Sequence, residues 1–415
     1  MVGIDNETPV VILGSAYGLA DLGILRSLGR LGVPLYVVSS NPQELAFRSR
    51  YCSGKILSDI CEFTEKSVLN LLNVGGKIGR RSILIPTTDQ GVTFLANNAE
   101  ALSEWFIFPH QTAELIHSAS SKKGMYYLAK KYKIPTPEAV FPQSKQDVLE
   151  SLETASFPIM LKEIHRWKSK EIDKVIVHSR RELVEKYDAM ENPEHPNLML
   201  QEYIPGRDEN VWMFNGYFDR YSNCLFGITG RKIRMWPVHQ GFTILGVCLK
   251  NETLVKTTIE FMKAIGYQGI VDVGYRFDAR DRKYKVLDIN PRIGSTFRLF
   301  VADEGMDVAR ALYLDMTGQS IGASVSDDGR KWLVEDLDLA SFFLCFLDRS
   351  LSLKQWINSY RGVAEAAYFA LDDPLPFLRM LEDHVKNRGH IVEVFRRLKS
   401  NNGRIEECIG ARGID

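Results

Sequence analysis

Length, composition and charge place the chain among ordinary water-soluble globular proteins. It has 415 residues, 45% of them apolar and 25% charged, so at about 150 residues per domain we expect two to four domains. Lysine plus arginine and aspartate plus glutamate each total 52, so the chain lacks the basic excess of a nucleic-acid-binding protein and no nucleic-acid partner is expected.

The first 120 residues predict a Rossmann-like domain. An apolar run at 9–14 is typical of a strand buried on both faces, a helical pattern follows at 15–32, and 33–40 has the pattern of a second strand. Strand, helix and strand in this order predict a parallel sheet. The run at 82–89 continues the sheet and places Asp89 just past the end of a strand, where ligands of open α/β sheets bind.

The glycines of the loop at 14–18 invite comparison with a dinucleotide site. The loop lacks the full G-x-G-x-x-G pattern, and the second strand ends in two serines where a dinucleotide-binding protein has an acidic residue for the ribose. We therefore expect a tight turn or a substrate loop here, and we do not expect an NAD-dependent dehydrogenase.

From residue 121 onward, helical and strand patterns alternate. The first helix lies within 121–142 and is closed by three prolines, because proline lacks the helix donor and restricts the residue before it. The next expected elements are a strand at 157–164, a strand at 174–179, a helix at 181–190, two strands joined by a turn at 197–214, further β structure at 223–237, an amphipathic helix at 251–266 and a hairpin at 269–294. From about residue 325 the chain is expected to be mostly helical, with a basic tail.

The cysteines and the hydropathy pattern favour the cytoplasm. The six cysteines form no C-x-x-C pair, which argues against a zinc site or a disulfide framework. The N-terminus shows no signal peptide pattern. The longest apolar run, at 339–347, is too short to cross a bilayer and predicts a buried helix or strand. We expect a cytoplasmic protein with no membrane partner.

The hairpin at 269–294 carries the strongest chemical signal. In the stretch VLDINPRIG, the side chains of Asp288, Asn290 and Arg292 lie at two-residue spacing and project from one face of a strand. Asp272 stands on the neighbouring strand. Two carboxylates and an amide oxygen are ligands suited to Mg²⁺, and two such ions could bridge nucleotide phosphates during phosphoryl transfer. The alternative is that Asp288 and Arg292 merely form an ion pair across a turn.

Four segments in the right order make the chain resemble the ATP-grasp superfamily, and within it the predicted carboxylate–amine ligases. They are SSKKGMYYLAKKYKIPTP, FPIMLKE, LQEYIPG and the hairpin VDVGYRFD…YKVLDINPRIG. The resemblance covers about residues 9–320. It implies an α/β fold with a Rossmann-like domain at 1–120, an ATP-grasp domain at 121–324 and a helical extension at 325–415. The ATP-grasp domain would divide into a lid subdomain at about 121–200 and a metal-binding subdomain at about 201–324.

The resemblance also implies roles for individual residues. Lys122 and Lys162 match the lysines that contact ATP phosphates, with Lys123 as a competitor for the first role, and a compact ammonium group suits phosphate oxygens. The adenine hinge matches Gln201, Glu202, Tyr203 and Ile204. The ribose would be bound by Glu209 or, in the other register, Asp208.

The metal ligands and the catalytic cations complete the expected site. Asp272, Asp288 and Asn290 match the metal ligands, and Arg292 matches the arginine that reaches phosphate or the acyl-phosphate intermediate. Further cations on a strand-like stretch could face the triphosphate or an acidic substrate, and Arg298 could bind a substrate carboxylate. These strand cations are Arg231, Lys232 and Arg234, of which Lys232 and Arg234 are expected on one face.

The implied activity is ATP-dependent ligation of a carboxylate to an amine through an acyl phosphate, with ADP and phosphate released. ATP and two Mg²⁺ ions, or Mn²⁺, would be the cofactors, and an amino acid or peptide a substrate. A homodimer is the default assembly. Two features depart from many relatives: Asp288 replaces a glutamate, and the loop after Lys162 has no glycine. The alternatives are a biotin- or bicarbonate-dependent carboxylase, although no A-M-K-M segment is present, and a non-catalytic nucleotide-binding regulator.

Overall fold

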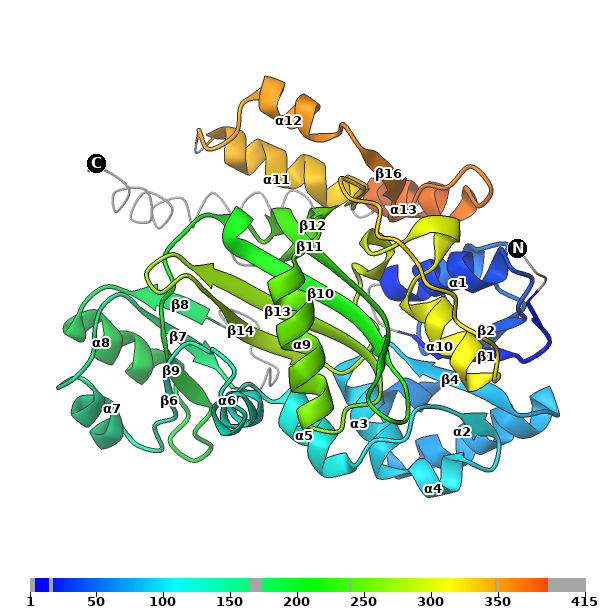
Figure 1. Ribbon diagram of the computed structural model, residues 1–415, viewed down its shortest axis with the longest axis horizontal. Coiled ribbons are helices and arrows are strands. Elements are labelled where there is room, and N and C mark those ends of the chain that lie inside the picture. The colour runs from blue at the N-terminus through cyan, green and yellow to red at the C-terminus, as the bar shows by residue number, and fades with distance from the viewer. Residues whose placement is uncertain (1–3, 15–17, 165–173, 239–240, 348, 387–415) are drawn as a thin grey trace.

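The structure is a computed structural model that describes residues 4–14, 18–164, 174–238, 241–347 and 349–386. These residues build three β-sheets with helices packed around them (Figure 1). Part of the loop at 14–18, most of the loop after Lys162 and the basic tail from 387 lie outside the described residues.

The N-terminal sheet is parallel throughout, as the sequence predicts. Its order is β3-β2-β1-β4-β5, and β1 is buried along its whole length. Because the strand order reverses between β1 and β4, the switch point at which such sheets bind ligands lies at the ends of these two strands. The strands are β1 (Val10–Leu13), β2 (Leu35–Ser39), β3 (Gly54–Leu57), β4 (Ser82–Pro86) and β5 (Phe106–Ile107). The helices around this sheet are α1 (Leu19–Gly29), α2 (Glu65–Ile78), α3 (Asp89–Asn97), α4 (Ala99–Leu102) and α5 (Ala113–Ser120), with 3-10 turns η1 (Leu45–Arg48) and η2 (Asp59–Glu62).

A small antiparallel sheet of order β6-β9-β7-β8 follows. Its strands are β6 (Ala139–Val140), β7 (Ile159–Glu163), β8 (Lys174–Val177) and β9 (Leu198–Glu202), and its helices are α7 (Lys145–Ser151) and α8 (Arg180–Met190). Helix α6 (Lys122–Lys131) precedes this sheet and packs Met125 and Ala129 into the core of the large sheet. Apolar side chains of α7 and α8 form a core of their own with β7, β8 and β9. In Figure 1 this unit lies at the lower left, beside the larger sheet.

The large sheet has seven strands in the order β14-β13-β10-β11-β12-β15-β16. Helix α9 (Glu252–Ala264) packs on one face, and α10 (Val308–Met316) contributes to the core on the other (Figure 1). The strands are β10 (Val211–Phe218), β11 (Cys224–Trp236), β12 (Phe242–Cys248), β13 (Gly269–Asp278), β14 (Lys283–Asn290), β15 (Lys331–Leu333) and β16 (Val363–Ala366), and the short turns are η3 (Asp208–Asn210), η4 (Phe297–Leu299) and η5 (Asp303–Gly305).

The C-terminal region is helical, as expected, but it also completes the large sheet. Its helices are α11 (Glu335–Leu347), α12 (Leu353–Ser359) and α13 (Leu375–Lys386). The sequence did not predict β15 and β16, which are three and four residues long. The apolar run at 339–347 forms the second part of α11, but it is not the buried element that was expected. Phe342 and Cys345 are buried, whereas Leu339, Phe343, Phe346 and Leu347 are exposed. Among the described helices, none combines the length and the apolar content needed to span a membrane.

One apolar core joins the N-terminal sheet to the large sheet and the C-terminal region. It contains residues of β1 and α1, of β10 and β11, and of the C-terminal region, such as Ile12, Leu25, Tyr217, Trp332 and Tyr368. Buried charges reinforce the join, because Arg26 of α1 pairs with Asp373 at 3.1 Å. The small sheet, by contrast, packs on a separate core.

Candidate active site

The hairpin of β13 and β14 brings the three expected metal ligands together. Asp272 lies opposite Asn290 and Gly274 lies opposite Asp288, so all three polar side chains belong to one face. Two glycines make room for the carboxylates. A Cβ added at Gly274 would lie 2.0 Å from Asp288 Oδ1, and one at Gly294 would lie 2.5 Å from Asp272 Oδ2. The glycine in VDVG and the one that ends NPRIG therefore shape this site.

The two carboxylates are close enough to repel each other. Burial and, after it, the neighbouring Asp288 raise the pKa of Asp272 to about 6, against the opposing effect of Arg292 and Lys232. The Asn290 amide nitrogen donates to the backbone carbonyl of Asp272 at 3.3 Å, which leaves the amide oxygen to face a ligand. Among the described residues, no three His, Cys, Asp or Glu side chains are grouped to hold a metal ion. The oxygens of two carboxylates and one amide suit a hard cation, provided that phosphate or water supplies the remaining ligands.

Lys232 of β11 is the cation that faces this acidic pair. Burial lowers the pKa of Lys232, while Asp288, Asp272 and Asp208 act in the opposite direction. The ammonium group also donates to the carbonyl of Gly241 at 3.1 Å.

Arg234 was expected on the same face as Lys232, but it does not lie with Lys232 beside Asp272 and Asp288. Register shifts in β11 on both sides of Arg234 break the alternation of side chains. Arg234 instead bonds Asp338 of α11 at 2.6 Å and Ser359 of α12 at 2.8 Å. Its guanidinium group holds the C-terminal helices onto the large sheet.

Arg292 links the hairpin to the switch point of the N-terminal sheet. Its Nε donates to Asp89 Oδ1 at 2.5 Å. Asp89 opens α3 directly after β4, and the neighbouring Thr87 hydroxyl bonds the last carbonyl of β1 at 3.0 Å. The two residues lie 203 positions apart in the sequence. The site therefore extends to the ligand-binding edge of the Rossmann-like sheet, and an Arg292–Asp89 pair replaces the Asp288–Arg292 pair that was the alternative.

One of the two expected phosphate lysines reaches the strand that carries the other. Lys162 lies on β7, and Lys122 at the start of α6 donates its ammonium group to the backbone carbonyl of Glu163 on the same strand. Lys123 turns elsewhere, with its nitrogen 5.6 Å from the centre of the Phe141 ring. Of the two candidates on α6, Lys122 is the one that reaches β7.

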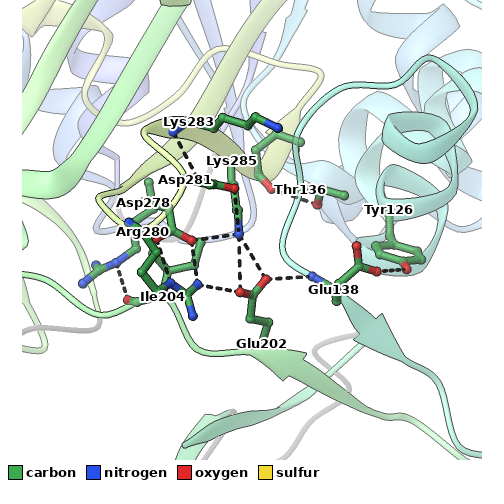
Figure 2. Close-up of polar contacts among 12 residues, drawn as sticks. Tyr126, Thr136, Glu138, Glu202, Ile204, Asp278, Arg280, Asp281, Lys283 and Lys285 are labelled. Atoms are coloured by element: carbon green, nitrogen blue, oxygen red, sulfur yellow. Dashed lines mark hydrogen bonds and ion pairs between the residues drawn. The ribbon is translucent and has the colours of Figure 1, made fainter. Parts of the chain in front are cut away.

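The expected adenine hinge ends β9 and is fixed by a network of charges (Figure 2). Lys285 Nζ lies 2.8 Å from Asp278 and 3.2 Å from Glu202, and Arg280 bonds both carboxylates. Glu202 also accepts from the backbone N–H of Glu138 at 3.2 Å. The side chain of Glu202 is therefore engaged with the β13–β14 hairpin and the segment after α6. Its backbone N–H also donates to the Glu138 carbonyl at 2.8 Å, so neither group is available to a nucleotide.

The residues after Glu202 are arranged by Arg276. Its guanidinium group donates to the carbonyls of Ile204 at 2.8 Å and Gly206 at 2.6 Å. Asp208 lies within electrostatic reach of both Arg276 and Lys232, whereas the side chain of Glu209 is exposed. The structure thus places Asp208 closer to the charged centre than Glu209.

Arg298, the other residue offered for a substrate carboxylate, is engaged within the protein. It is buried, and it pairs with Asp307 and with Glu365, the latter at 2.7 Å. Sequence reasoning missed Arg276, Arg280 and Lys285, which shape the hinge from the hairpin. Their signal is the charged segment RFDARDRKYK between the expected metal ligands Asp272 and Asp288.

No protein-family model matches the chain. D-aspartate ligase of Enterococcus faecium (strain Aus0004) is 25% identical over 275 residues, which cover 61% of this chain and 64% of the relative. The match thus spans slightly less than two thirds of that protein.

Two solved structures resemble the chain in fold. N5-carboxyaminoimidazole synthetase from Staphylococcus aureus, complexed with ADP, aligns with a TM-score of 0.60 and 13% identity over 77% of this chain and 80% of the other. L-amino acid ligase from Bacillus licheniformis aligns with a TM-score of 0.57 and 17% identity over 75% of each chain.

These similarities confirm the expected fold class. The chain has the ATP-grasp fold, preceded by a Rossmann-like parallel sheet and followed by a helical region. The curated relative and the second of these structures are named as ligases.

Proposed function

We propose that the chain is an ATP-dependent ligase that joins a carboxylate to an amine. A carboxylate oxygen attacks the γ-phosphorus of ATP, ADP leaves, the amine attacks the acyl phosphate, and inorganic phosphate departs. The observation that carries the proposal is the single cluster in which Asp272 and Asp288 meet Lys232 and Arg292. Carboxylates that can hold a metal ion, next to cationic side chains, suit a phosphoryl group. Phosphoryl transfer depends mainly on the positioning of the reactants and on neutralisation of the phosphate charge.

We assign the residues of the cluster as follows. Asp272, Asp288 and Asn290 would hold Mg²⁺, or Mn²⁺, at two sites, and the metal would neutralise phosphate charge. Lys122 and Lys162 bind phosphate oxygens. Arg292 reaches the acyl phosphate. Lys232 takes the role that the sequence also offered to Arg234, because it faces Asp288 and Asp272.

The nucleotide base would lie against the hinge formed by Gln201, Glu202, Tyr203 and Ile204. Since the carbonyl of Ile204 accepts from Arg276 and the N–H of Glu202 donates to Glu138, we assign adenine binding to the N–H of Ile204 and to the carbonyl of Glu202. The ribose would be bound by Asp208 or Glu209, of which Asp208 is the closer to the charged centre. ADP in a solved structure of the same fold supports ATP as the nucleotide.

We further propose an amino acid as one substrate. The similarity to a D-aspartate ligase and to an L-amino acid ligase supports this class. The domains would follow the sheets: a Rossmann-like domain at 1–120, a lid subdomain at about 121–200, a metal-binding subdomain at about 201–324 and an extension at 325–415. The separate core of the small sheet supports the lid assignment.

The test is a phosphate-release screen with ATP, Mg²⁺ and a matrix of amino acids, small carboxylic acids and bicarbonate. Release that requires both an acid and an amine supports the ligase, whereas release with bicarbonate alone would favour a carboxylase. Once the acid is known, its carboxylate is labelled with ¹⁸O. Label in inorganic phosphate is expected, because the C–O bond breaks when the amine arrives. Label in AMP, or AMP as the product, would refute the acyl-phosphate route.

We also propose a cytoplasmic homodimer. Six apolar side chains of α11 and α12 are between 46% and 69% exposed, namely Leu339, Phe343, Phe346, Leu347, Leu353 and Ile357. At about 100 Å² each they offer about 600 Å² per copy, near the roughly 800 Å² of a standard interface. Light scattering should give the dimer mass for the wild type and the monomer mass after Phe343→Glu with Phe346→Glu. A wild-type monomer at micromolar concentration would refute the dimer.

A further inference from the structure

Asn215 on β10 is a fully buried amide beside the expected metal ligands. Its side chain is 0% exposed, and neither amide atom has a hydrogen-bond partner among the described residues. Because both ends lack a partner, the conclusion does not depend on which way the amide is turned. A buried polar group without a hydrogen-bond partner is destabilising and uncommon, so we expect Asn215 to have a functional partner.

The sheet places Asn215 directly next to Asp272. Asn215 pairs in register with Asp272 of β13, and Asp272 pairs with Asn290 of β14. Residues that face each other across antiparallel strands point to the same side of a sheet. Asn215, Asp272 and Asn290 therefore form one row across three strands.

The described side chains that flank Asn215 on β10 offer it no hydrogen bond. Its neighbours on the same face, Met213 and Tyr217, belong to the apolar core with Ile228 and Phe297. Tyr217 differs from Asn215 because its hydroxyl group reaches Asp315 of α10 at 2.5 Å. An asparagine in this apolar setting is explained by the carboxylate beside it.

We propose that Asn215 is a positioning residue of the metal centre, whose amide N–H donates to the Asp272 carboxylate when the metal is bound. Such a bond would fix the carboxylate and leave its other lone pairs for the cation, as partners behind metal ligands do in other sites. This inference rests on the proposed function, because it needs a metal at Asp272 and Asp288.

The experiment compares metal affinity with the stability of the metal-free protein. Mn²⁺ binding in the presence of ADP is measured by electron paramagnetic resonance for the wild type, Asn215→Leu and Asn215→Ala, and thermal unfolding is measured without metal. Leucine fills the same space without polar atoms, so the metal-free Asn215→Leu protein should melt about 2 °C higher or more. Both variants should bind Mn²⁺ about 10- to 100-fold more weakly.

Two controls separate the possible outcomes. Thr229 is also buried in the large sheet, but its hydroxyl is satisfied by the Leu249 carbonyl at 2.6 Å and the Asn251 N–H at 3.0 Å. Thr229→Val should therefore lower the melting temperature and leave Mn²⁺ affinity unchanged. Asp288→Ala should abolish Mn²⁺ binding, and a wild type that binds no better than Asp288→Ala would overturn the metal centre and this inference together. If Asp288→Ala loses Mn²⁺ binding but both Asn215 variants bind Mn²⁺ with normal affinity, the role of Asn215 alone would be overturned.

Discussion

Replacing Lys285 by methionine would test how the adenine hinge is held. Lys285 is 11% exposed, and its ammonium group lies 2.8 Å from Asp278 and 3.2 Å from Glu202 (Figure 2). Asp278 is itself 1% exposed. Methionine keeps the length of the side chain and removes the charge. Glu202 and Asp278 would then share Arg280 alone, which is 48% exposed.

The expected magnitudes follow from these contacts. Hydrogen bonds to charged groups contribute about 1.5–3 kcal/mol each, and Arg280 retains part of the network, so we expect a loss of about 2–3 kcal/mol in unfolding free energy. The ion pairs of the Glu202 side chain fix the position of the hinge backbone. Since Lys285→Met weakens them, ADP should bind about 10-fold more weakly, which corresponds to about 1.4 kcal/mol. The kcat should change less than the KM for ATP, since Lys285 does not face the phosphates in the proposed site.

Three measurements decide this prediction: urea unfolding, calorimetry with ADP, and steady-state kinetics over a range of ATP concentrations. Lys285→Arg keeps the charge and should restore much of the ADP affinity. Lys283→Met is the matched control, because Lys283 is exposed on the same strand. A loss of stability with unchanged ADP affinity would show that the network is structural only. A loss of kcat with normal KM would place Lys285 in the chemistry instead.

Four further substitutions give distinct outcomes. Asp288→Ala should abolish Mg²⁺-dependent turnover while the circular dichroism spectrum stays native, and near-normal activity would remove the metal assignment. Lys162→Met should lower ATP affinity or turnover at least ~10-fold, about 1.4 kcal/mol, and no change in either would assign Lys162 to the surface. Asp373→Asn should cost about 3–5 kcal/mol in urea unfolding, because it leaves the buried Arg26 guanidinium without its counter-charge, and a cost below about 1 kcal/mol would contradict the role of that pair. The pKa of Asp278 is held well below its usual range by hydrogen bonding to Arg280, so its stabilising effect is complete above about pH 4 and declines as the pH falls further. Asp278→Asn should therefore be less stable than the wild type at pH 7, with a smaller difference at pH 3, and a constant difference would refute the linkage.

Local patterns predicted the parts of this site that depend on local geometry. The two-residue spacing of Asp288 and Asn290 is a property of an extended strand, and the structure places both on the face that carries Asp272. The apolar strand at 9–14 and the βα order likewise predicted the parallel N-terminal sheet. These features need only the alternation of side chains and the order of elements.

Where the sequence misled, the cause was a local irregularity or a distant partner. The same two-residue rule failed for Lys232 and Arg234, because register shifts in β11 turn them to different environments. The strands β15 and β16 are too short to show a period, and they form because the edge of β12 offers unpaired backbone groups. The place of Asn215 beside Asp272 depends on register between strands more than 50 residues apart, which no single segment encodes.

The distribution of cores separates the small sheet from the N-terminal sheet and the C-terminal region. A single apolar core and the Arg26–Asp373 pair join the N-terminal sheet, the large sheet and the C-terminal region, so Asp89 and Arg292 are carried by one continuous body. The small sheet has its own core and carries Lys162. It is joined to the large sheet at the expected adenine hinge, where Glu202 at the end of β9 pairs with Lys285 of β14. Elements with separate cores can rotate about such a junction at low cost. In the proposed enzyme, closure of the small sheet would bring Lys162 toward phosphates that the metal ligands and Arg292 already hold, and water would be excluded as the acyl phosphate forms.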